Sequence, residues 1–403
     1  MKILIVCQYY YPEPFRISDI CESLVERGHE VTILTGLPNY PEGKILKEYK
    51  NGKKRVEKLN GVEIIRCFEI GRGNNKVSLF LNYLSFMISA SIKALFIKRD
   101  FDIVLVNQLS PVMMAIPAII YKKKNKKKII TYCLDLWPDS LVAGGIKKES
   151  LIYKVFYQIS RKIYKSSDKI LISSKMFEKY FIDYLKVNNI EINYLPQYAE
   201  DIFFSNVCIN NFKLEENINS KVFNFMFAGN IGKAQSIETI MEAANILQNN
   251  ENIHFHIVGD GSNLESCKLI AKQYELNNIT FYGRRDIYEM PMFYDMADAM
   301  IVSLKNDEKL SYTLPGKVQS YMAAGKPIIG SVNGEAKRVI EEAKCGLVCE
   351  AENFEELAKI ILEFCNMNKK DEMGKNSREY YSNYFSKEYF FKNLNTILKN
   401  MEE

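Results

Sequence analysis

Two short stretches of the sequence combine glycine, lysine and the start of a predicted helix. FAGNIGKAQS places Gly229, Asn230 and Lys233 directly after an apolar strand pattern, and LPGKVQSYMAAGKPII places Gly316 and Lys317 where helix-forming residues begin. Backbone N–H groups at a helix start are free and carry about half a positive charge. They favour phosphate oxygens, and a lysine beside them adds to the attraction. The pattern predicts a diphosphate site, and turns that use glycine only for their geometry remain the alternative.

Three other loops after predicted strands carry polar or charged groups. YGRR supplies Arg284, which could approach a base or a phosphate or could simply be exposed, and SVNGE supplies Glu335 at another helix start. VGDGSNL begins like a dinucleotide fingerprint, but Leu264 stands where the third glycine belongs. The stretch is therefore weak evidence for NAD.

Metal chemistry has little support in the sequence. His29, His254 and His256 are the only histidines, too few and too widely spaced for an obvious zinc site. No carboxylate-rich D-x-D sequence stands in a suitable loop. We expect neither a bound metal nor a cofactor.

The elements that must position these loops are short buried strands alternating with helices. KILIVCQY, EVTILTG, VEIIRC, FDIVLVNQ, KIITYCLD, KILISS and INYLP form one series, and FNFMFAGN, IHFHIVGDG, ITFYGR, AMIVSL, PIIGSV and GLVCE form a second. Unbroken apolar, β-branched runs separated by helices predict parallel sheets covered on both faces. A polar, asparagine-rich stretch over residues 200–222 separates the series. The fold class is therefore α/β with two doubly wound, Rossmann-like domains, and ligands should bind beyond the carboxyl ends of the strands, in a cleft between the domains.

Composition limits the class of protein further. The chain has 403 residues, 47% of them hydrophobic, and a net charge of +5, which is too small for a nucleic-acid-binding role. Nine scattered cysteines without a C-x-x-C pair indicate a reduced, cytosolic protein. Six lysines fall within residues 122–128, where they could attract anionic lipid or phosphate or could form a solvated loop.

Residues Val77 to Ile97 contain a single charged residue, Lys93, and approach the length of a membrane-spanning helix. Asn82 and four serines, together with strand patterns on both sides, argue against spanning. A buried or crossover helix and a helix lying on the membrane with its apolar face in lipid both remain open.

The order of motifs in the second series resembles the donor-binding domain of family four glycosyltransferases. FAGNIGKAQ, IVGDG, YGR, YTLPGKVQSYMAAGKPII and GLVCE carry this resemblance. QYYYPEPFR, RGHEV, LTGLPNYPEGK and DLWPDS in the first series are similar to a bacterial branch that transfers sugars, including N-acetyl-L-fucosamine, during O-antigen and capsule assembly.

The resemblance implies a GT-B fold, with an acceptor-binding domain over residues 1–202 and a nucleotide-sugar-binding domain over 203–380. A C-terminal helix would follow over 381–403, with packing against the N-terminal domain as one option. It also implies retention at the anomeric carbon without a metal, UDP as the expected nucleotide, and a lipid-linked saccharide as acceptor. The location would then be cytoplasmic, peripheral at the inner face of the cell membrane.

The chain departs from the family pattern at several positions. Tyr312 and Ser320 stand where many members have two glutamates, so Gln319, Ser320 or Glu335 would have to replace the usual clamp on the ribose. The glycine-rich loop that is usual in the family after the first strand is replaced by PEPFR, which leaves Arg16 as a candidate phosphate ligand.

Leu134 stands where many relatives have a histidine. This makes Asp135 the candidate for accepting or orienting the proton of the acceptor, with a helix cap or a hydrogen bond inside its own loop as the alternative.

The electrostatic logic of the transfer assigns Lys233 and Lys317, with oriented N–H groups, to the negative charge that develops on the departing diphosphate. Three other functions remain alternatives. The first is a nucleotide-sugar epimerase of the same fold, and the second is a dinucleotide-dependent oxidoreductase. The third is a non-catalytic nucleotide-sugar-binding subunit.

Overall fold

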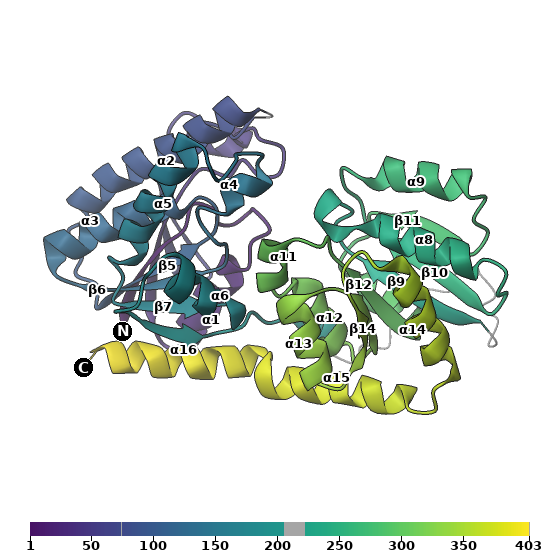
Figure 1. Ribbon diagram of the computed structural model, residues 1–403. Helices are drawn as coiled ribbons and strands as arrows, with labels where there is room; N and C mark the ends of the chain where they lie inside the picture. The colour runs from purple at the N-terminus through teal and green to yellow at the C-terminus, as the bar shows by residue number, and fades with distance from the viewer. Residues whose placement is uncertain (74, 205–221, 403) are drawn as a thin grey trace. The chain divides into compact units, whose positions relative to one another are not determined.

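The computed structural model describes residues 1–73, 75–204 and 222–402 (Figure 1). The chain divides into two compact units. The first comprises Met1–Ser173, Phe177–Leu195 and the end of the chain from Asn395, and the second comprises Ser174–Met176 and the described part of Pro196–Leu394. Most of the polar stretch predicted as a linker lies outside the described residues.

The first unit contains an eight-stranded sheet of order β3-β4-β2-β1-β5-β6-β7-β8. Its strands are parallel except β3, which pairs antiparallel with β4. The strands are β1 (Lys2–Val6), β2 (Glu30–Thr35), β3 (Val56–Leu59), β4 (Val62–Arg66), β5 (Ile103–Gln108), β6 (Lys128–Cys133), β7 (Lys169–Ile172) and β8 (Glu191–Tyr194). The helices along this part of the chain are α1 (Ile17–Glu26), α2 (Lys76–Phe96), α3 (Ile116–Asn125), α4 (Ser140–Ala143), α5 (Leu151–Tyr164) and α6 (Met176–Lys179).

The second unit contains a six-stranded sheet of order β11-β10-β9-β12-β13-β14 in which each recorded pairing is parallel. The strands are β9 (Phe223–Ala228), β10 (Ile253–Val258), β11 (Ile279–Gly283), β12 (Ala299–Ser303), β13 (Ile328–Ser331) and β14 (Gly346–Cys349). The helices are α7 (Asp201–Phe204), α8 (Ile237–Leu247), α9 (Leu264–Gln273), α10 (Met290–Met296), α11 (Glu308–Tyr312), α12 (Gly316–Ala323), α13 (Gly334–Glu342), α14 (Phe354–Asn366), α15 (Lys370–Tyr384) and the first part of α16 (Lys387–Glu402), whose residues from Asn395 onward belong to the first unit.

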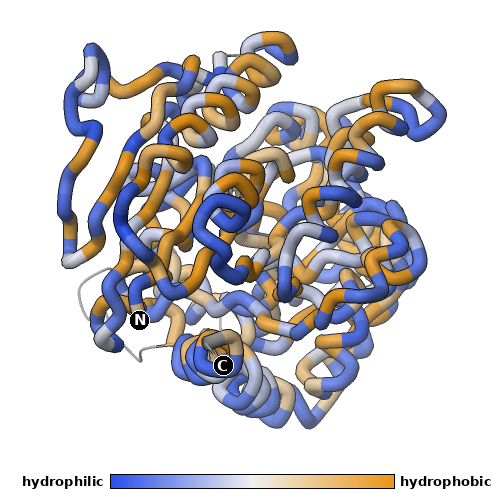
Figure 2. The backbone as a smooth tube through the Cα atoms, turned by 90° about the vertical axis from the view of Figure 1, so that its left-hand side faces the viewer, coloured by the Kyte–Doolittle hydropathy of each residue, from blue (hydrophilic) through white to orange (hydrophobic). Residues whose placement is uncertain are grey.

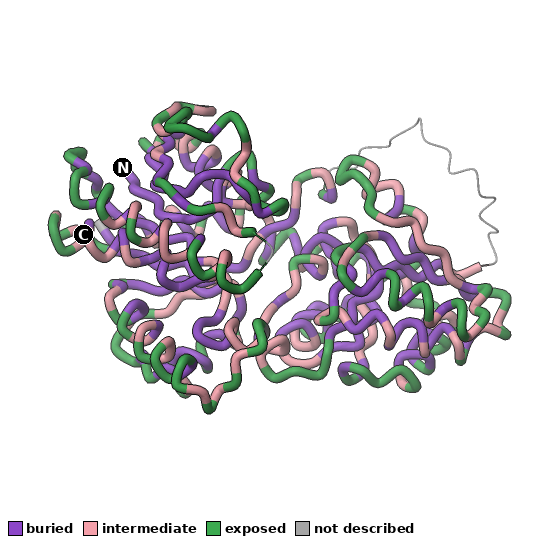
Figure 3. Tube along the Cα trace, turned by 90° about the horizontal axis from the view of Figure 1, so that it is seen from above, coloured by how far each residue is buried: buried purple, intermediate pink, exposed green. Residues whose placement is uncertain are grey.

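Apolar runs place the strands in the two cores. Ile3, Leu4, Ile5 and Val6 of β1 are fully buried, as strands flanked by parallel neighbours and covered by helices should be. Apolar stretches of the trace (orange, Figure 2) and buried stretches (purple, Figure 3) occur in both units. The predicted α/β class with two parallel, Rossmann-like sheets is confirmed. Strand β3 was not predicted, because two of its four residues, VEKL, are charged and the strand lies at the edge of the sheet.

Helix α2 confirms that the apolar segment near Val77–Ile97 is helical. Among the described residues it is the one helix long and apolar enough to cross a membrane, judged by length and composition alone. Only 22% of its most apolar window is buried in the protein. α2 joins β4 to β5, two parallel strands of the same sheet, so the predicted crossover helix is confirmed, but it is not buried on all sides.

Candidate donor site at the carboxyl edge of the second sheet

The loops that follow β9, β10 and β11 bond to one another at the carboxyl edge of the second sheet. The backbone N–H of Gly229 donates to the carbonyl of Val258 at 2.9 Å, and that of Gly259 donates to Gly283 at 2.8 Å. Ile231 donates to the carbonyl of Asp260 at 2.9 Å. Because neighbouring parallel strands end at the same edge, the predicted phosphate loop is held by its neighbours as well as by its own turn.

Close packing explains why two of these loops contain glycine. A Cβ atom on Gly259 would lie 1.8 Å from the carbonyl oxygen of Gly229, and one on Gly261 would lie 2.3 Å from that of Ile231. Gly259 also has a φ of +142°, which other residues rarely adopt. The two glycines that resemble the start of a dinucleotide fingerprint are therefore required by contacts between loops of the protein itself.

Lys317 has the most unusual environment of the predicted site residues. It is the second residue of α12, and its Nζ lies 3.7 Å from the centre of the Phe227 ring at the end of β9. A Cβ atom on Gly229 would lie 3.5 Å from this Nζ, so the ammonium sits directly beside the loop after β9. Nζ is enclosed and has no hydrogen-bond partner among the described residues. Desolvation lowers the pKa of Lys317 to about 7.

A cation in this position attracts an anion strongly. The ring face of Phe227 supplies a weak interaction with the positive charge, but no carboxylate or carbonyl satisfies the ammonium within the described part of the chain. In the same turn, the backbone N–H groups of Gly316 and Lys317 have no recorded partner in the described structure, whereas that of Val318 donates to the carbonyl of Pro315 at 2.9 Å. The structure thus brings Lys317, Gly229 and the amino end of an eight-residue helix together.

The other predicted phosphate-binding residues of the β9 loop are accessible. Lys233 is exposed and opens the short 3-10 helix Lys233–Gln235. Asn230 is also exposed, and its side-chain amide donates to Gln235 Oε1 at 3.4 Å. That oxygen also accepts from the backbone N–H of Gly232 at 3.1 Å. Gln235 therefore fixes the path of the loop on which both residues stand.

Gly316, the first residue of α12, is exposed, and a Cβ atom there would meet no atom within 4 Å. Nothing in the described part of the protein requires glycine at this position. Gly316 thus differs from Gly259 and Gly261, which lie against backbone.

The residues proposed to replace the ribose clamp are bonded inside the second unit. Gln319 is buried and donates its side-chain amide to the carbonyl of Gln197 at 2.5 Å. Ser320 donates its hydroxyl to the carbonyl of Gly316, one turn back along α12, at 3.2 Å. Both side chains already have protein partners, so a ribose would have to share them or displace them.

Glu335 is fully buried and is held by an ion pair. Its carboxylate accepts from Arg338 Nη2 at 2.8 Å and from Arg338 Nε at 3.1 Å, and it also accepts from the backbone N–H of Lys175 at 3.1 Å. The pair raises the pKa of the Arg338 guanidinium above its ordinary value. The carboxylate of Glu335 is thus directed toward Arg338 on its own helix.

The two candidate arginines lie in different units. Arg284 is exposed in the loop after β11, and the neighbouring Arg285 lies 5.7 Å from the centre of the Phe293 ring. Arg16 is half-buried and directly precedes α1 in the first unit.

Asp135 lies after β6 at the carboxyl edge of the first sheet. Its Oδ1 accepts from the hydroxyl of Ser140 at 2.6 Å, and its Oδ2 accepts from the hydroxyl of Ser110. Ser110 Oγ in turn accepts from the indole N–H of Trp137 at 2.8 Å. Trp137 is buried and packs edge-on against Phe156. Two hydroxyl donors therefore fix a half-buried carboxylate at the edge where ligands of such sheets bind.

A buried pair of carboxyl groups was not predicted from the sequence. Glu69, just beyond β4, is fully buried and accepts from the amides of Gln8, at 3.2 Å, and Asn39. Glu13 is also buried and accepts from the backbone N–H of Asn39 at 2.9 Å. Burial, with repulsion from Glu13, raises the pKa of Glu69 well above its ordinary value. The only signal in the sequence is one glutamate within the apolar run CFEIG.

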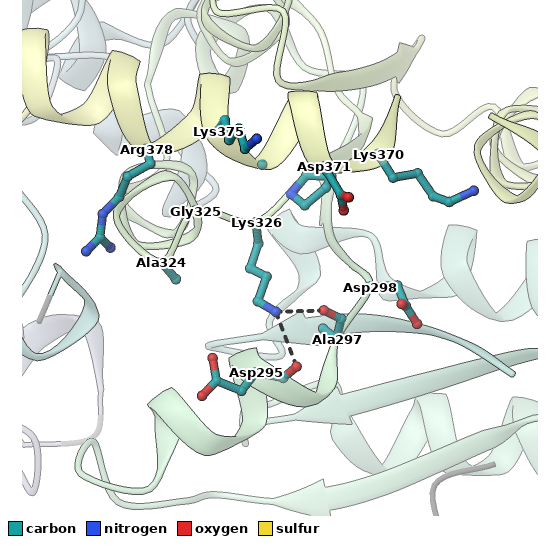
Figure 4. A pocket seen from close by; sticks show the side chains of 12 residues that line it. Asp295, Ala297, Asp298, Ala324, Gly325, Lys326, Lys370, Asp371, Lys375 and Arg378 are labelled. Atoms are coloured by element: carbon teal, nitrogen blue, oxygen red, sulfur yellow. Dashed lines mark hydrogen bonds between the residues drawn. The ribbon is translucent and has the colours of Figure 1, made fainter. Parts of the chain in front are cut away.

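A pocket of about 720 Å³ opens at the other edge of the second sheet, before β12 and β13 (Figure 4). Lys326 extends across it and donates to the carbonyls of Ala297, at 3.0 Å, and Asp295, at 3.2 Å. None of the predicted site residues lines this pocket. The ammonium of Lys326 is already hydrogen-bonded to protein carbonyls, in contrast to that of Lys317.

Metal-ligating side chains are not clustered in the described ranges, where no group of three or more His, Cys, Asp or Glu residues could hold an ion. One of the three histidines, His256, is already held by protein partners. Its ring is buried between Asn224 and Tyr282, with hydrogen bonds of 3.0 and 2.9 Å, and burial lowers its pKa to about 3.

Comparisons with known proteins agree with this architecture. Residues 16–197 match the family described as Glycosyltransferase Family 4, and residues 209–380 match Glycosyl transferases group 1. The chain is 28% identical over 320 residues to a Pseudomonas aeruginosa protein named as glycosyltransferase WbjE, covering 75% of this chain and 76% of that one. It is 24% identical over 341 residues to the Escherichia coli protein WcaI, named for colanic acid biosynthesis, covering 81% and 82%.

Solved structures share the fold over the whole length. Sucrose-phosphate synthase from Thermosynechococcus elongatus superposes with a TM-score of 0.76 at 16% identity, covering 99% of this chain and 98% of that one. HepE from Anabaena, solved in complex with UDP, superposes with a TM-score of 0.71 at 12% identity, covering 99% and 100%. At such identities the likeness shows the fold alone.

The two parallel sheets and the match over both halves define a glycosyltransferase of the GT-B type. The chain belongs to glycosyltransferase family 4, the group 1 glycosyltransferases, and is a retaining enzyme that uses a nucleotide-sugar donor. The epimerase, the oxidoreductase and the non-catalytic subunit are no longer needed as alternatives.

Proposed function

We propose that this enzyme transfers N-acetyl-L-fucosamine, or another N-acetylamino sugar, from a UDP-linked donor to a lipid-linked saccharide in cell-surface polysaccharide synthesis. The observation that carries the donor side of the proposal is the enclosed, unpartnered ammonium of Lys317 beside Gly229. The HepE structure with UDP and the naming of WcaI for colanic acid biosynthesis support the choice of nucleotide and process.

Lys317 and the free N–H groups of α12 would bind the diphosphate. Cleavage of the bond to the anomeric carbon places negative charge on the departing phosphate oxygen. Groups already aimed at that charge stabilise the transition state without reorganising. Lys233, on the exposed loop after β9, would add a second positive charge, so that the leaving group needs no proton donor.

Asp135 would orient or accept the proton of the acceptor hydroxyl. Its carboxylate is half-buried and fixed by Ser110 and Ser140, which gives it the defined geometry that a general base requires. The similarity of DLWPDS and QYYYPEPFR to the branch that handles N-acetyl-L-fucosamine supports the choice of sugar.

The nucleotide is tested by thermal unfolding of the full chain with UDP, GDP, dTDP or ADP. A nucleotide at 100 times its dissociation constant stabilises the folded state by about 2.7 kcal/mol. We expect UDP to produce the largest shift. A larger shift with another nucleotide would reassign the donor, and no shift with any of them would contradict the assignment of Lys317.

Transfer is tested with UDP-N-acetylamino sugars and a lipid-linked saccharide, by following acceptor-dependent release of UDP. Lys317→Ala and Lys233→Ala should each slow turnover by about 100-fold or more, as loss of one transition-state donor does. Lys272→Ala is the matched control, because Lys272 is an exposed lysine on α9 in the same unit. Turnover near the wild-type rate in both loop variants would remove these lysines from the mechanism.

A further inference from the structure

Helix α2 presents a continuous apolar face to solvent. The exposed large apolar side chains of this helix are Val77, Phe80, Leu81, Ile88, Ile92, Leu95 and Phe96. At about 100° per residue they fall on one half of the helix, and its buried residues, among them Phe86, Ala90 and Ala94, fall on the opposite half. A contiguous exposed apolar surface of this kind marks an interaction site.

Hydrogen bonds on its inner side hold α2 against the rest of the first unit. Asn82 donates to the carbonyl of Ile70 at 2.6 Å and accepts from the side-chain amide of Gln8 at 2.9 Å. Ser85 accepts from the backbone N–H of Ile70 at 2.9 Å. Crossing a bilayer would require α2 to leave these partners, so a lipid surface would be met by the outer face alone.

A pocket of about 450 Å³ extends the apolar face between α2 and the edge of the first sheet. Ile92 and Phe96 of α2 line it together with exposed Phe68. Three cationic residues also line it: Arg66, which is paired with Glu57, and Arg55 and Lys93. Arg55 and Lys93 have no recorded ion pair in the described part of the chain. Apolar side chains beside such positive charge suit a lipid, which joins an acyl chain to an anionic headgroup.

The six lysines within residues 122–128, the lysine tract, lie next to the carboxyl end of α2. Lys124 donates its ammonium to the carbonyl of Leu95, near the end of α2. Lys122 and Lys127 are paired with Asp168 and Asp100. The tract also contains exposed lysines without recorded ion pairs in the described structure, which are Lys123, Lys126 and Lys128.

We propose that the outer face of α2, the adjoining pocket and the lysine tract together bind the surface of an anionic lipid bilayer, with α2 lying in the plane of the membrane. Apolar burial and attraction of lysines to anionic headgroups combine in this mode of binding. The proposal concerns the first unit and does not depend on the identity of the donor. It would place the enzyme where a lipid-linked acceptor resides.

The test is flotation of the full chain with vesicles of phosphatidylcholine alone or mixed with phosphatidylglycerol. We expect wild type to bind the mixed vesicles at least about tenfold more tightly, less so at high salt. Ile92→Ser with Phe96→Ser should weaken binding to the mixed vesicles by at least about tenfold. Leu269→Ser is the matched control, since Leu269 is a similarly exposed apolar residue (68%) on α9 of the second unit.

A second variant, Lys123→Gln with Lys126→Gln, should reduce the preference for phosphatidylglycerol while leaving weak binding to phosphatidylcholine. Far-UV circular dichroism and an unchanged thermal shift with nucleotide confirm that the variants are folded. The proposal is overturned if wild type binds neither vesicle, or if the Ile92/Phe96 variant binds as wild type does.

Two other occupants of the α2 face give different results. A concentration-dependent dimer that the Ile92/Phe96 variant loses, without vesicle binding, would assign the face to a second copy of the chain. Resistance of the membrane-bound protein to alkaline carbonate extraction would assign α2 as a spanning helix. Either result overturns in-plane binding, and neither affects the nucleotide assignment.

Discussion

Binding of a nucleoside diphosphate should take up a proton at Lys317. In the free protein the pKa of Lys317 is about 7, because its ammonium is desolvated and unpartnered. A diphosphate beside the ammonium would favour the charged form and return the pKa toward the ordinary lysine value of about 10.4. As pH rises above 7 the free protein loses the charge that the ligand needs, so affinity must fall.

The magnitude follows from linkage between the two protonation states. With these values the apparent dissociation constant should rise about 50-fold from pH 7 to pH 9, and binding at pH 8 should take up about 0.9 proton. The diphosphate is itself almost fully ionised over this range, so it adds little. Titration calorimetry at pH 8 in two buffers of different ionisation enthalpy measures the proton uptake, and titrations at pH 7, 8 and 9 measure the affinity.

Two variants isolate the group responsible. Lys317→Met should bind UDP weakly, with an affinity independent of pH and without proton uptake. Lys233→Met should also bind UDP weakly. It should keep the pH dependence, because Lys233 is exposed and the enclosed ammonium of Lys317 is still present in this variant. A wild-type dissociation constant that is flat from pH 7 to 9, or proton uptake that persists in Lys317→Met, would refute the reasoning.

Two other substitutions should separate stability from function. Gly316→Ala should raise the free energy of unfolding in urea by about 0.5–1 kcal/mol, because it adds a helix former where a Cβ atom meets no other atom. The same substitution should weaken UDP binding at the amino end of α12. Unchanged binding would show that the ligand does not approach that turn. In wild type, Glu69 should lower the free energy of unfolding as pH rises, and Glu69→Gln should remove this decrease. The native pKa of Glu69 is raised, so its contribution to the free energy of unfolding is full below the unfolded pKa of about 4.3. Above that pH the contribution falls by up to about 1.4 kcal/mol per pH unit. Equal slopes of the free energy of unfolding against pH for variant and wild type between about pH 5 and 7 would contradict this.

The sequence predicts the parts of the fold that are set by local pattern. The runs KILIV and IVLVNQ are β1 and β5, because a strand buried on both faces must be apolar throughout. The edge strand β3 carries Glu57 and Lys58 on a partly exposed surface, so it lacks that pattern. The same reasoning placed Gly229 and Lys233 after a strand, and Lys317 in the first turn of a helix.

Contacts between distant segments account for what the sequence did not predict. Gln319 bonds to the backbone of Gln197, and the pattern around either residue gives no sign of the other. The enclosure of Lys317 depends on Phe227, ninety positions earlier in the chain, and is visible only when β9 and α12 are side by side. The pair of Glu335 and Arg338 could have been anticipated, since residues three apart on a helix are neighbours.

The contrast between the charged groups of Glu335 and Lys317 explains why Lys317 suits catalysis. The Glu335 carboxylate is already paired with Arg338, so contact with a ligand would mostly exchange one partner for another. The Lys317 ammonium has lost its water and gained only the face of a ring. A group left in that state interacts most strongly with the site where negative charge develops, and only interactions that strengthen in the transition state accelerate the reaction. The buried lysine is costly to the folded protein for the same physical reason that it would be effective against a departing diphosphate.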